Sequence, residues 1–230
     1  MNKVRICLLM SGMPRVFLTG LDLLRRQLGS EMESEIHLFT HFWSPVSPKL
    51  EEDLRSQFTN LVIWQSEPRN FFDVAIERKH AETNPANFLS MLWGRQLLLE
   101  HLVQEQLLQD ELFDLFIHTR PDVALTDSLN LLDCIRLIRT GNRVLVPRSG
   151  HWRNGVNDQF AVSNAYGIKA YLSLYEKVLH YHQHGRQFFR KLPLHPEIML
   201  KHHLNENGLT VQKMDLDNVI FRSECKFAIG

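Results

Sequence analysis

Short apolar runs alternate along the chain with longer segments in which apolar residues recur every three or four positions. The first run, Val4 to Met10, is apolar except for Arg5, as expected for a strand that is buried on both faces of a parallel sheet. Behind it, apolar residues are spaced by four, three and four positions, which predicts an amphipathic helix. These residues are Phe17, Leu21, Leu24 and Leu28.

The same alternation continues to the C-terminus. Further strands are predicted over Ile36–Phe42, Leu61–Trp64, Phe113–His118, Arg143–Pro147, Phe160–Ser163, Thr210–Met214 and Val219–Arg222. Further helices are predicted over Leu50–Phe58, Pro85 to about Gln109, Leu129–Arg139, the segment between Ser163 and about His182, and a segment that opens at Pro196. The longest helix has Asn84 in the N-cap position and Pro85 in the first turn, and both favour a helix start. Residues 65–83 and 148–157 are polar and irregular and are predicted to be loops.

Strands that alternate with helices predict a mostly parallel central sheet with helices on both faces. A length of 230 residues fits one large domain, and 44% hydrophobic with 23% charged residues is typical of a globular protein with a full core. We therefore expect a single-domain α/β protein of the Rossmann-like kind.

Charge and cysteine content narrow the class of protein further. Lys plus Arg and Asp plus Glu number 26 each, so we expect no nucleic-acid partner, although a local basic patch for an anionic ligand is compatible with this balance. The three cysteines form no CxxC pair, so buried free thiols are expected rather than a disulfide framework. The first apolar run is too short for a signal peptide, and no run predicts a membrane span. We expect a cytoplasmic location, with peripheral membrane contact and oligomeric state left open.

The first candidate site follows the first strand, at Ser11-Gly12-Met13-Pro14-Arg15. In open α/β sheets, ligands bind at the carboxyl ends of the strands. Gly12 permits close backbone approach, the next helix offers N–H groups, and Arg15 can form paired hydrogen bonds with a phosphate. Because the segment is neither GxGxxG nor a Walker loop, an ordinary turn with a surface arginine is the alternative.

The second candidate follows the strand Phe113–His118, at Arg120-Pro121-Asp122. Pro121 ends the strand and fixes the chain so that Asp122 projects at the strand's end. A carboxylate there can bind Mg²⁺ or Mn²⁺ that bridges a diphosphate, and Arg120 can neutralise the same charge. The alternative is an Arg120–Asp122 ion pair that only fixes the turn.

The third candidate lies within residues 148–159. Asn157, Asp158 and Gln159 carry amides and a carboxylate, which match the donors and acceptors of sugar hydroxyls. Trp152 can either stack on a sugar or base or anchor the loop. The alternative for the whole group is a set of caps and turns.

Glu197 is the fourth candidate. It lies in the first turn of the helix predicted to open at Pro196, where the helix dipole favours a negative charge. A catalytic carboxylate and a simple N-terminal carboxylate both fit this position. The sequence contains no HExxH metal motif and no GxSxG nucleophile motif.

Five motifs in a fixed order resemble one family of enzymes. They are ICLLMSGMPRVF at 6–17, EIHLFTHFW at 35–43, FDLFIHTRPD at 113–122, NDQFAVS at 157–163 and HPEIMLKHHL at 195–204. The set spans nearly the whole chain and resembles small GT-A-type glycosyltransferases of bacterial polysaccharide clusters and large DNA viruses. The resemblance implies one GT-A domain over residues 1–230, with a nucleotide-binding half at 1–125 and an acceptor-side half at 126–230.

The resemblance also implies a nucleotide-sugar donor and a glycan or glycoconjugate acceptor. The nucleotide diphosphate would be held by Ser11, Gly12, Arg15 and Arg120. Asp122 stands at the place of the family's metal-binding DxD motif and would bind Mn²⁺ or Mg²⁺. The chain has one carboxylate where a full DxD has two, so Arg120 would supply part of the cation's charge.

The same resemblance assigns the remaining candidates to the sugars. Asn157, Asp158 and Gln159 would lie near the donor or acceptor sugar, and Glu197 would lie on the acceptor side. Asp158 and Glu197 are the two carboxylates proposed as the catalytic base for an acceptor hydroxyl. The sequence does not decide the donor sugar, the acceptor or the stereochemical outcome.

Two other classes fit parts of the sequence. Another nucleotide-dependent transferase, such as a sulfotransferase or nucleotidyltransferase, needs a phosphate-binding loop with Lys or Arg early in the chain, and Ser11-Gly12-Met13-Pro14 does not provide it. A non-catalytic module with the same fold would bind a nucleotide-sugar or glycan without turnover. Fold alone cannot separate these classes, because function depends on the site.

Overall fold

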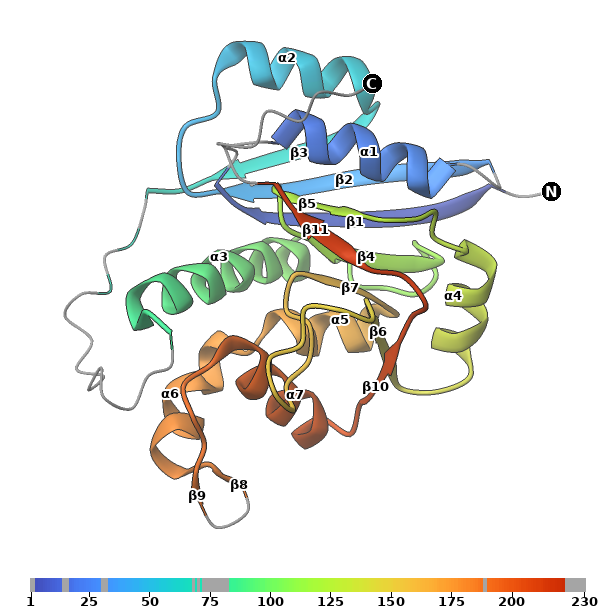
Figure 1. The fold of residues 1–230 in the computed structure, drawn as a ribbon. Helices are drawn as coiled ribbons and strands as arrows, with labels where there is room; N and C mark the ends of the chain where they lie inside the picture. The colour runs from blue at the N-terminus through green and yellow to red at the C-terminus, as the bar shows by residue number, and fades with distance from the viewer. Residues whose placement is uncertain are drawn as a thin grey trace.

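Seven strands form one central sheet in the order β10-β6-β7-β4-β1-β2-β3 (Figure 1). The structure is a computed structural model that describes residues 3–13, 17–29, 33–67, 69, 71, 83–187 and 190–221. The strands are β1 (Val4–Gly12), β2 (Ser34–Phe42), β3 (Asn60–Gln65), β4 (Leu115–Thr119), β6 (Arg143–Val146), β7 (Phe160–Ser163) and β10 (Thr210–Lys213). Neighbouring strands run parallel except at β7, which is antiparallel to both β4 and β6. The mostly parallel sheet predicted from the sequence is confirmed.

Helices cover both faces of this sheet. They are α1 (Phe17–Gly29), α2 (Pro48–Gln57), α3 (Pro85–Gln104), α4 (Leu131–Arg139), α5 (Ala165–Leu172), α6 (Tyr175–His184) and α7 (Pro196–Glu206). Figure 1 shows α1 and α2 on one side of the strands and α5 to α7 on the other. The side chains of β1 alternate between two buried clusters: Ile6 and Leu8 pack with α1, α2 and α4, whereas Cys7 and Leu9 pack with α3, α5, α6 and α7.

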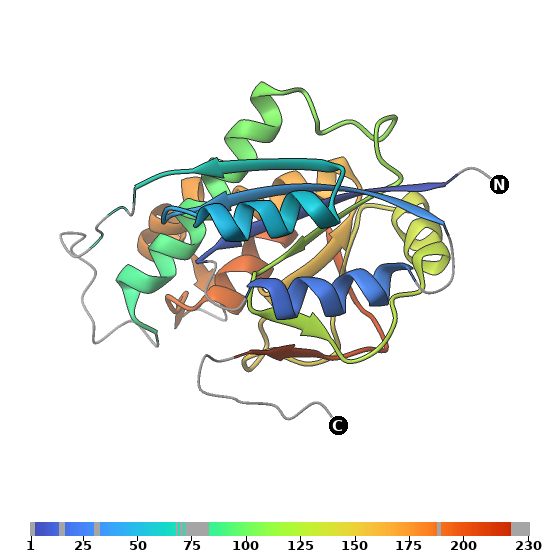
Figure 2. The same cartoon turned by 90° about the horizontal axis from the view of Figure 1, so that it is seen from above.

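Two small antiparallel sheets accompany the central one. β5 (Val123–Leu125) pairs with β11 (Asn218–Ile220), and β8 (Arg186–Gln187) pairs with β9 (Arg190–Lys191). Figure 2 shows β11 outside the central strands, near α1. The strand predicted at Val219–Arg222 therefore lies partly in β11 and does not join the central sheet.

The structure corrects two helix boundaries. The helix predicted to end near Gln109 ends at Gln104, and Gln106 has a left-handed φ of 54° that cannot continue it. The helix predicted to reach His182 is two helices, since α5 ends at Leu172 and α6 begins at Tyr175. At the break, the Ser173 hydroxyl donates to the Ala170 carbonyl at 3.2 Å. The predicted cap is confirmed, since the Asn84 side chain accepts from the Ala86 N–H at 3.0 Å.

Buried thiols are also confirmed where the structure describes them. Cys7 and Cys134 are buried and unpaired. Cys225 lies outside the described residues. Within the described part of the chain, every helix is too short or too polar to cross a membrane.

Candidate functional site

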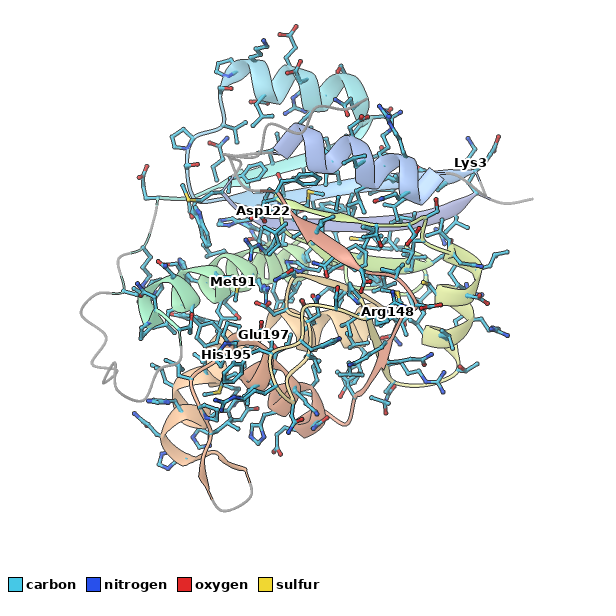
Figure 3. The ribbon with its side chains drawn as sticks, viewed as in Figure 1. Lys3, Met91, Asp122, Arg148, His195 and Glu197 are labelled. Carbon is cyan, nitrogen blue, oxygen red and sulfur yellow. The ribbon has the colours of Figure 1, made fainter. Side chains whose placement is uncertain are left out.

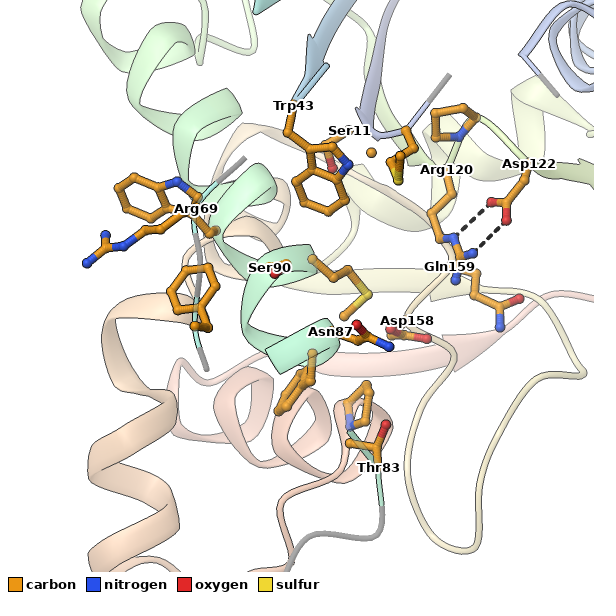
Figure 4. Close-up of a pocket in the computed structure, with 18 of the residues that line it drawn as sticks. Ser11, Trp43, Arg69, Thr83, Asn87, Ser90, Arg120, Asp122, Asp158 and Gln159 are labelled. Carbon is orange, nitrogen blue, oxygen red and sulfur yellow. Dashed lines mark hydrogen bonds and ion pairs between the residues drawn. The ribbon is translucent and has the colours of Figure 1, made fainter. Parts of the chain in front are cut away.

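A cleft of about 1040 Å³ opens at the carboxyl ends of β1, β2 and β4 (Figure 4). Ser11 and Gly12 end β1, Trp43 follows β2, and Arg120 follows β4, and all of them line the cleft. Residues of α3 and of the first turn of α7 contribute the other walls. Open α/β sheets bind their ligands at this edge.

The end of β1 packs closely against the turn that follows β4. Gly12 has a φ of +139°, and a Cβ there would lie 3.2 Å from the Cδ of Pro121. Ser11 is buried, and its hydroxyl is 3.3 Å from Nε2 of His118. Burial, followed by the positive charges of Arg95 and Arg120, holds the pKa of His118 well below its usual range, so this imidazole is neutral. Arg15, the phosphate ligand predicted next to these residues, lies outside the described residues.

Arg120 and Asp122 form a bidentate ion pair at the mouth of this turn. Nε of Arg120 donates to Oδ1 of Asp122 at 2.9 Å, and Nη2 donates to Oδ2 at 2.6 Å (Figure 4). The Arg120–Asp122 ion pair, which is the alternative to a metal site in the sequence analysis, is therefore present. Both residues also line the cleft.

The described residues do not fit the Mn²⁺ or Mg²⁺ site expected at Asp122. Each carboxylate oxygen of Asp122 already accepts a hydrogen bond from Arg120, so a metal ion would have to compete with the guanidinium for this carboxylate. Among the residues that the structure describes, His, Cys, Asp and Glu side chains form no group of three or more that could hold a metal ion.

Asp158 is paired with an arginine that the sequence analysis missed. Oδ2 of Asp158 lies 3.5 Å from Nη2 of Arg95, and this nitrogen also donates to the main-chain carbonyl of Asp158. The Arg95 guanidinium lies 5.3 Å from the centroid of the Tyr171 ring, and the Arg95 side chain is 1% exposed. The one signal in the sequence was a charged residue among the apolar positions of the longest helix, between Leu92 and Leu99.

Asn157 does not line the cleft. It is fully buried, and its Oδ1 accepts from the N–H groups of Gln159 and Phe160 at 2.8 and 3.1 Å. Its Nδ2 donates to the Ser149 carbonyl and to Oδ1 of Asn218, both at 2.8 Å. These bonds use all of its amide, so Asn157 connects the 148–157 loop to β11, and the contact with a sugar expected from the sequence does not fit this position. Gln159 does line the cleft.

Glu197 lies in the cleft, next to His195 at the start of α7 (Figure 3). Oε2 of Glu197 is 2.6 Å from Nδ1 of His195, and the Glu197 side chain is 14% exposed. Burial, followed by the negative charge of Asp158, raises the pKa of Glu197 from 4.5 to about 7. The carboxyl group can therefore gain or lose a proton near neutral pH, as a general acid or base must.

The 148–157 loop holds this helix start in place. The Trp152 ring stacks on the His195 ring with a centroid distance of 3.9 Å and an interplanar angle of 14°. The Val156 N–H donates to the Glu197 carbonyl at 3.0 Å. Of the two roles considered for Trp152, the structure therefore supports the loop anchor.

No protein-family model matches the chain, and no curated protein sequence matches it either. Solved structures do resemble it. The apo form of the glycosyltransferase GlyE from Streptococcus pneumoniae TIGR4 is similar with a TM-score of 0.50 at 11% identity, over 92% of this chain and 45% of that one. The apo form of mouse xyloside xylosyltransferase 1 is similar with a TM-score of 0.46 at 13% identity, over 92% and 86%.

The likeness to GlyE shows a shared fold. The chain spans less than half of the length of GlyE, and an identity of 11% is too low to transfer the role of any residue. The α/β fold expected from the sequence is thus confirmed and is shared with GlyE, whereas the chemistry depends on the residues of the cleft.

Proposed function

We propose that the chain is a glycosyltransferase that moves a sugar from a nucleotide-sugar donor to a hydroxyl of a glycan or glycoconjugate. The reaction forms a bond between the acceptor oxygen and the anomeric carbon and breaks the bond between that carbon and the diphosphate. The acceptor proton goes to a base, and the nucleoside diphosphate leaves. The cleft takes residues from both expected halves, 1–125 and 126–230, so a donor held by the first half and an acceptor held by the second would meet in it.

The position of Glu197 in the cleft, together with its raised pKa, is the observation that carries this proposal. A base must be ionised in an appreciable fraction and must still hold a proton strongly, so a pKa of about 7 suits it at neutral pH. Asp158, the other candidate base, is buried and pairs with Arg95. We therefore assign the proton transfer to Glu197, and Asp158 contributes the negative charge that helps to raise the pKa of Glu197.

The diphosphate would lie at the carboxyl end of β1. Ser11 and Gly12 offer backbone there, and among the described residues Arg120 contributes a guanidinium on that side of the cleft. A phosphate could share Arg120 with Asp122, because a guanidinium has five N–H donors and Asp122 uses two of them. Arg15 would join them, and Gln159 would face a sugar hydroxyl.

A binding module without turnover is the second candidate. The observation that favours it is the Arg120–Asp122 pair, which fills the position expected for a catalytic metal. Such a module would bind the nucleotide-sugar and release it unchanged.

The biological setting is proposed from the resemblance of the motifs. It suggests polysaccharide synthesis in a bacterial or large-virus system and action in the cytoplasm, with a membrane surface as one place where the acceptor would be met. For this reason, oligosaccharides are the acceptors of choice for a first assay.

Transfer is tested with UDP-, GDP-, dTDP- and CMP-sugars and a panel of oligosaccharides, with nucleotide release and products followed by mass spectrometry. Donor binding is measured in parallel by thermal shift. We expect Glu197→Gln to keep donor binding and to lose about 10²- to 10⁴-fold in kcat, which is the usual contribution of a general base. Glu206→Gln, on the exposed last turn of the same helix, is the matched control and should behave like the wild type.

The outcomes separate the candidates. Donor binding without product formation with any acceptor would favour the binding module. A wild-type protein that binds none of the nucleotide-sugars would contradict both candidates. Full activity in Glu197→Gln would leave the transferase intact and remove Glu197 as its base.

A further inference from the structure

Arg69 is fixed on the wall of the cleft by aromatic rings. Its guanidinium carbon lies 4.7 Å from the centroid of Trp93 and 5.2 Å from the centroid of Phe71. Trp93 belongs to α3, and both rings contact Tyr175 of α6, at 5.1 and 6.1 Å between centroids. An exposed arginine side chain that would otherwise sample many rotamers is thereby restricted at the rim of the cleft, on the side away from Arg120 (Figure 4).

The N–H groups of Arg69 remain available for a ligand. Cation–π contacts use the face of a ring and consume none of the five N–H donors of a guanidinium. Among the described residues, no carboxylate lies within ion-pair distance of Arg69, whereas Arg95 and Arg120, the other two arginines described at the cleft and beneath it, pair with Asp158 and Asp122. A planar guanidinium with its donors unused is suited to bidentate binding of a carboxylate or phosphate.

Arg69 lies apart from the place proposed for the donor diphosphate, so a carboxylate or phosphate bound by Arg69 would be a different group. Figure 4 shows Arg69 and Arg120 on opposite sides of the cleft, with Trp43 between them. The volume of about 1040 Å³ lies at the upper end of the usual range of ligand pockets, about 300–1,000 Å³, so the cleft can hold an acceptor as well as a donor.

We propose that Arg69 binds an oxyanion on the acceptor sugar, either the carboxylate of an acidic sugar or a phosphate ester. This inference rests on the proposed transferase function. It gives that function an acceptor class, anionic glycans, and a residue that selects them.

The test compares matched sugars that differ in charge. Dissociation constants are measured by ligand-detected NMR for methyl β-glucoside, methyl β-glucuronide and glucose 6-phosphate, and by calorimetry for UDP and GDP. We expect at least one anionic sugar to bind about tenfold or more tightly than the neutral glucoside, as a charge-assisted bidentate contact permits. The glucuronide and phosphate arms separate the two sources of negative charge.

Arg69→Gln should abolish this preference and leave nucleotide binding within about twofold of the wild type. Arg153→Gln is the matched control, because Arg153 also stacks on a tryptophan, at 4.2 Å from the Trp152 centroid, and does not line the cleft. It should keep the preference. Arg69→Lys, which keeps the charge and loses the planar fork, should show an intermediate preference.

The inference would be overturned by equal affinity of the wild type for charged and neutral sugars, or by a preference that survives in Arg69→Gln. A loss of UDP or GDP affinity in Arg69→Gln as large as the loss for the sugars would also overturn it, by assigning Arg69 to the donor. A wild type that binds none of the UDP-, GDP-, dTDP- and CMP-sugars but keeps an Arg69-dependent preference would contradict the transferase and would still support an anion site at Arg69.

Discussion

The carboxylate of Asp158 lies 3.5 Å from Nη2 of Arg95 beneath the cleft, and the two side chains are 6% and 1% exposed. Arg95 belongs to α3, and Asp158 lies just before β7, so the pair connects two walls of the site. Charges removed from water are stabilised only when they meet opposite charge and hydrogen-bond partners at close range. The stability of the fold and the charge at the site therefore depend on the same contact.

Removal of one partner should be costly. Arg95→Met would leave the Asp158 carboxylate buried without its cation, which is expected to lower the free energy of unfolding by about 3–5 kcal/mol. Urea denaturation of the wild type and the variant measures this difference. The double variant Arg95→Met/Asp158→Asn removes both charges and should recover part of the loss. A single variant as stable as the wild type would contradict a buried ion pair at this position.

The activity of the proposed transferase should rise with pH near neutrality. A base works when it is ionised, and the pKa of Glu197 is about 7 because of burial and the charge of Asp158. We expect kcat/KM to rise as the pH passes through about 7 and to level off above it. Asp158→Asn removes the neighbouring charge and should move this rise to lower pH. A pH profile that is flat between 6 and 8 would exclude Glu197 as the group that controls the rate.

The same group should make the fold less stable at higher pH. Below pH 4.5 the Glu197 carboxyl is protonated in both the folded and unfolded states, and above about 7 it is ionised in both. Between these values the folded state holds a proton that the unfolded state has lost, so the contribution of Glu197 to the free energy of unfolding falls as the pH rises. Glu197→Gln cannot ionise, so its stability relative to the wild type should increase across this window. Parallel denaturation curves at several pH values measure the difference, and an unchanged difference would contradict the raised pKa.

Gly155 should be required for the geometry of Glu197. A Cβ at Gly155 would lie 2.5 Å from the Cβ of Glu197 and 2.7 Å from its carbonyl carbon, so the loop or the helix start must move. We expect Gly155→Ala to reduce kcat strongly and to cost about 1–3 kcal/mol of stability, as overpacking does. In Gly141→Ala the nearest atom would be Nε of Arg143 at 3.7 Å, an ordinary contact, so this control should keep wild-type activity. Equal activity of the two variants would show that the loop does not position Glu197.

The fold could be predicted wherever a short stretch of chain carries its own pattern. The apolar run of β1 and the Asn84 cap of α3 are local signals, and both are confirmed. β5 and β11 have three residues each and meet from opposite halves of the chain, so neither carries a period that identifies its partner. The break after α5 lies at Ser173, inside a stretch whose apolar pattern predicts one continuous helix.

The candidate site could be predicted in part for a similar reason. Strand ends gather at one edge of a parallel sheet, so Gly12 and Arg120 were expected together, and both line the cleft. Arg95 was missed because its partner, Asp158, is brought to it only by the tertiary fold. Asn157 was assigned to a sugar in error, because an amide can bind a sugar or stabilise a turn and the sequence does not distinguish the two. Its full burial and its hydrogen bond with the Gln159 N–H show that it stabilises the turn.

Donor binding should not depend on a divalent cation if the Arg120–Asp122 pair persists in the complex. Both oxygens of Asp122 accept from Arg120, so the guanidinium takes the place in which a cation would neutralise the diphosphate. We expect the affinity for the correct nucleoside diphosphate, measured by calorimetry, to be equal in EDTA and in Mn²⁺. Arg120→Gln should weaken this binding about tenfold or more, because a charge-assisted contact is lost. Arg55→Gln, on the exposed surface of α2 and paired with Glu51 at 2.7 Å, is the matched control. Binding that disappears in EDTA and in Asp122→Ala would instead identify Asp122 as a metal ligand in the donor complex.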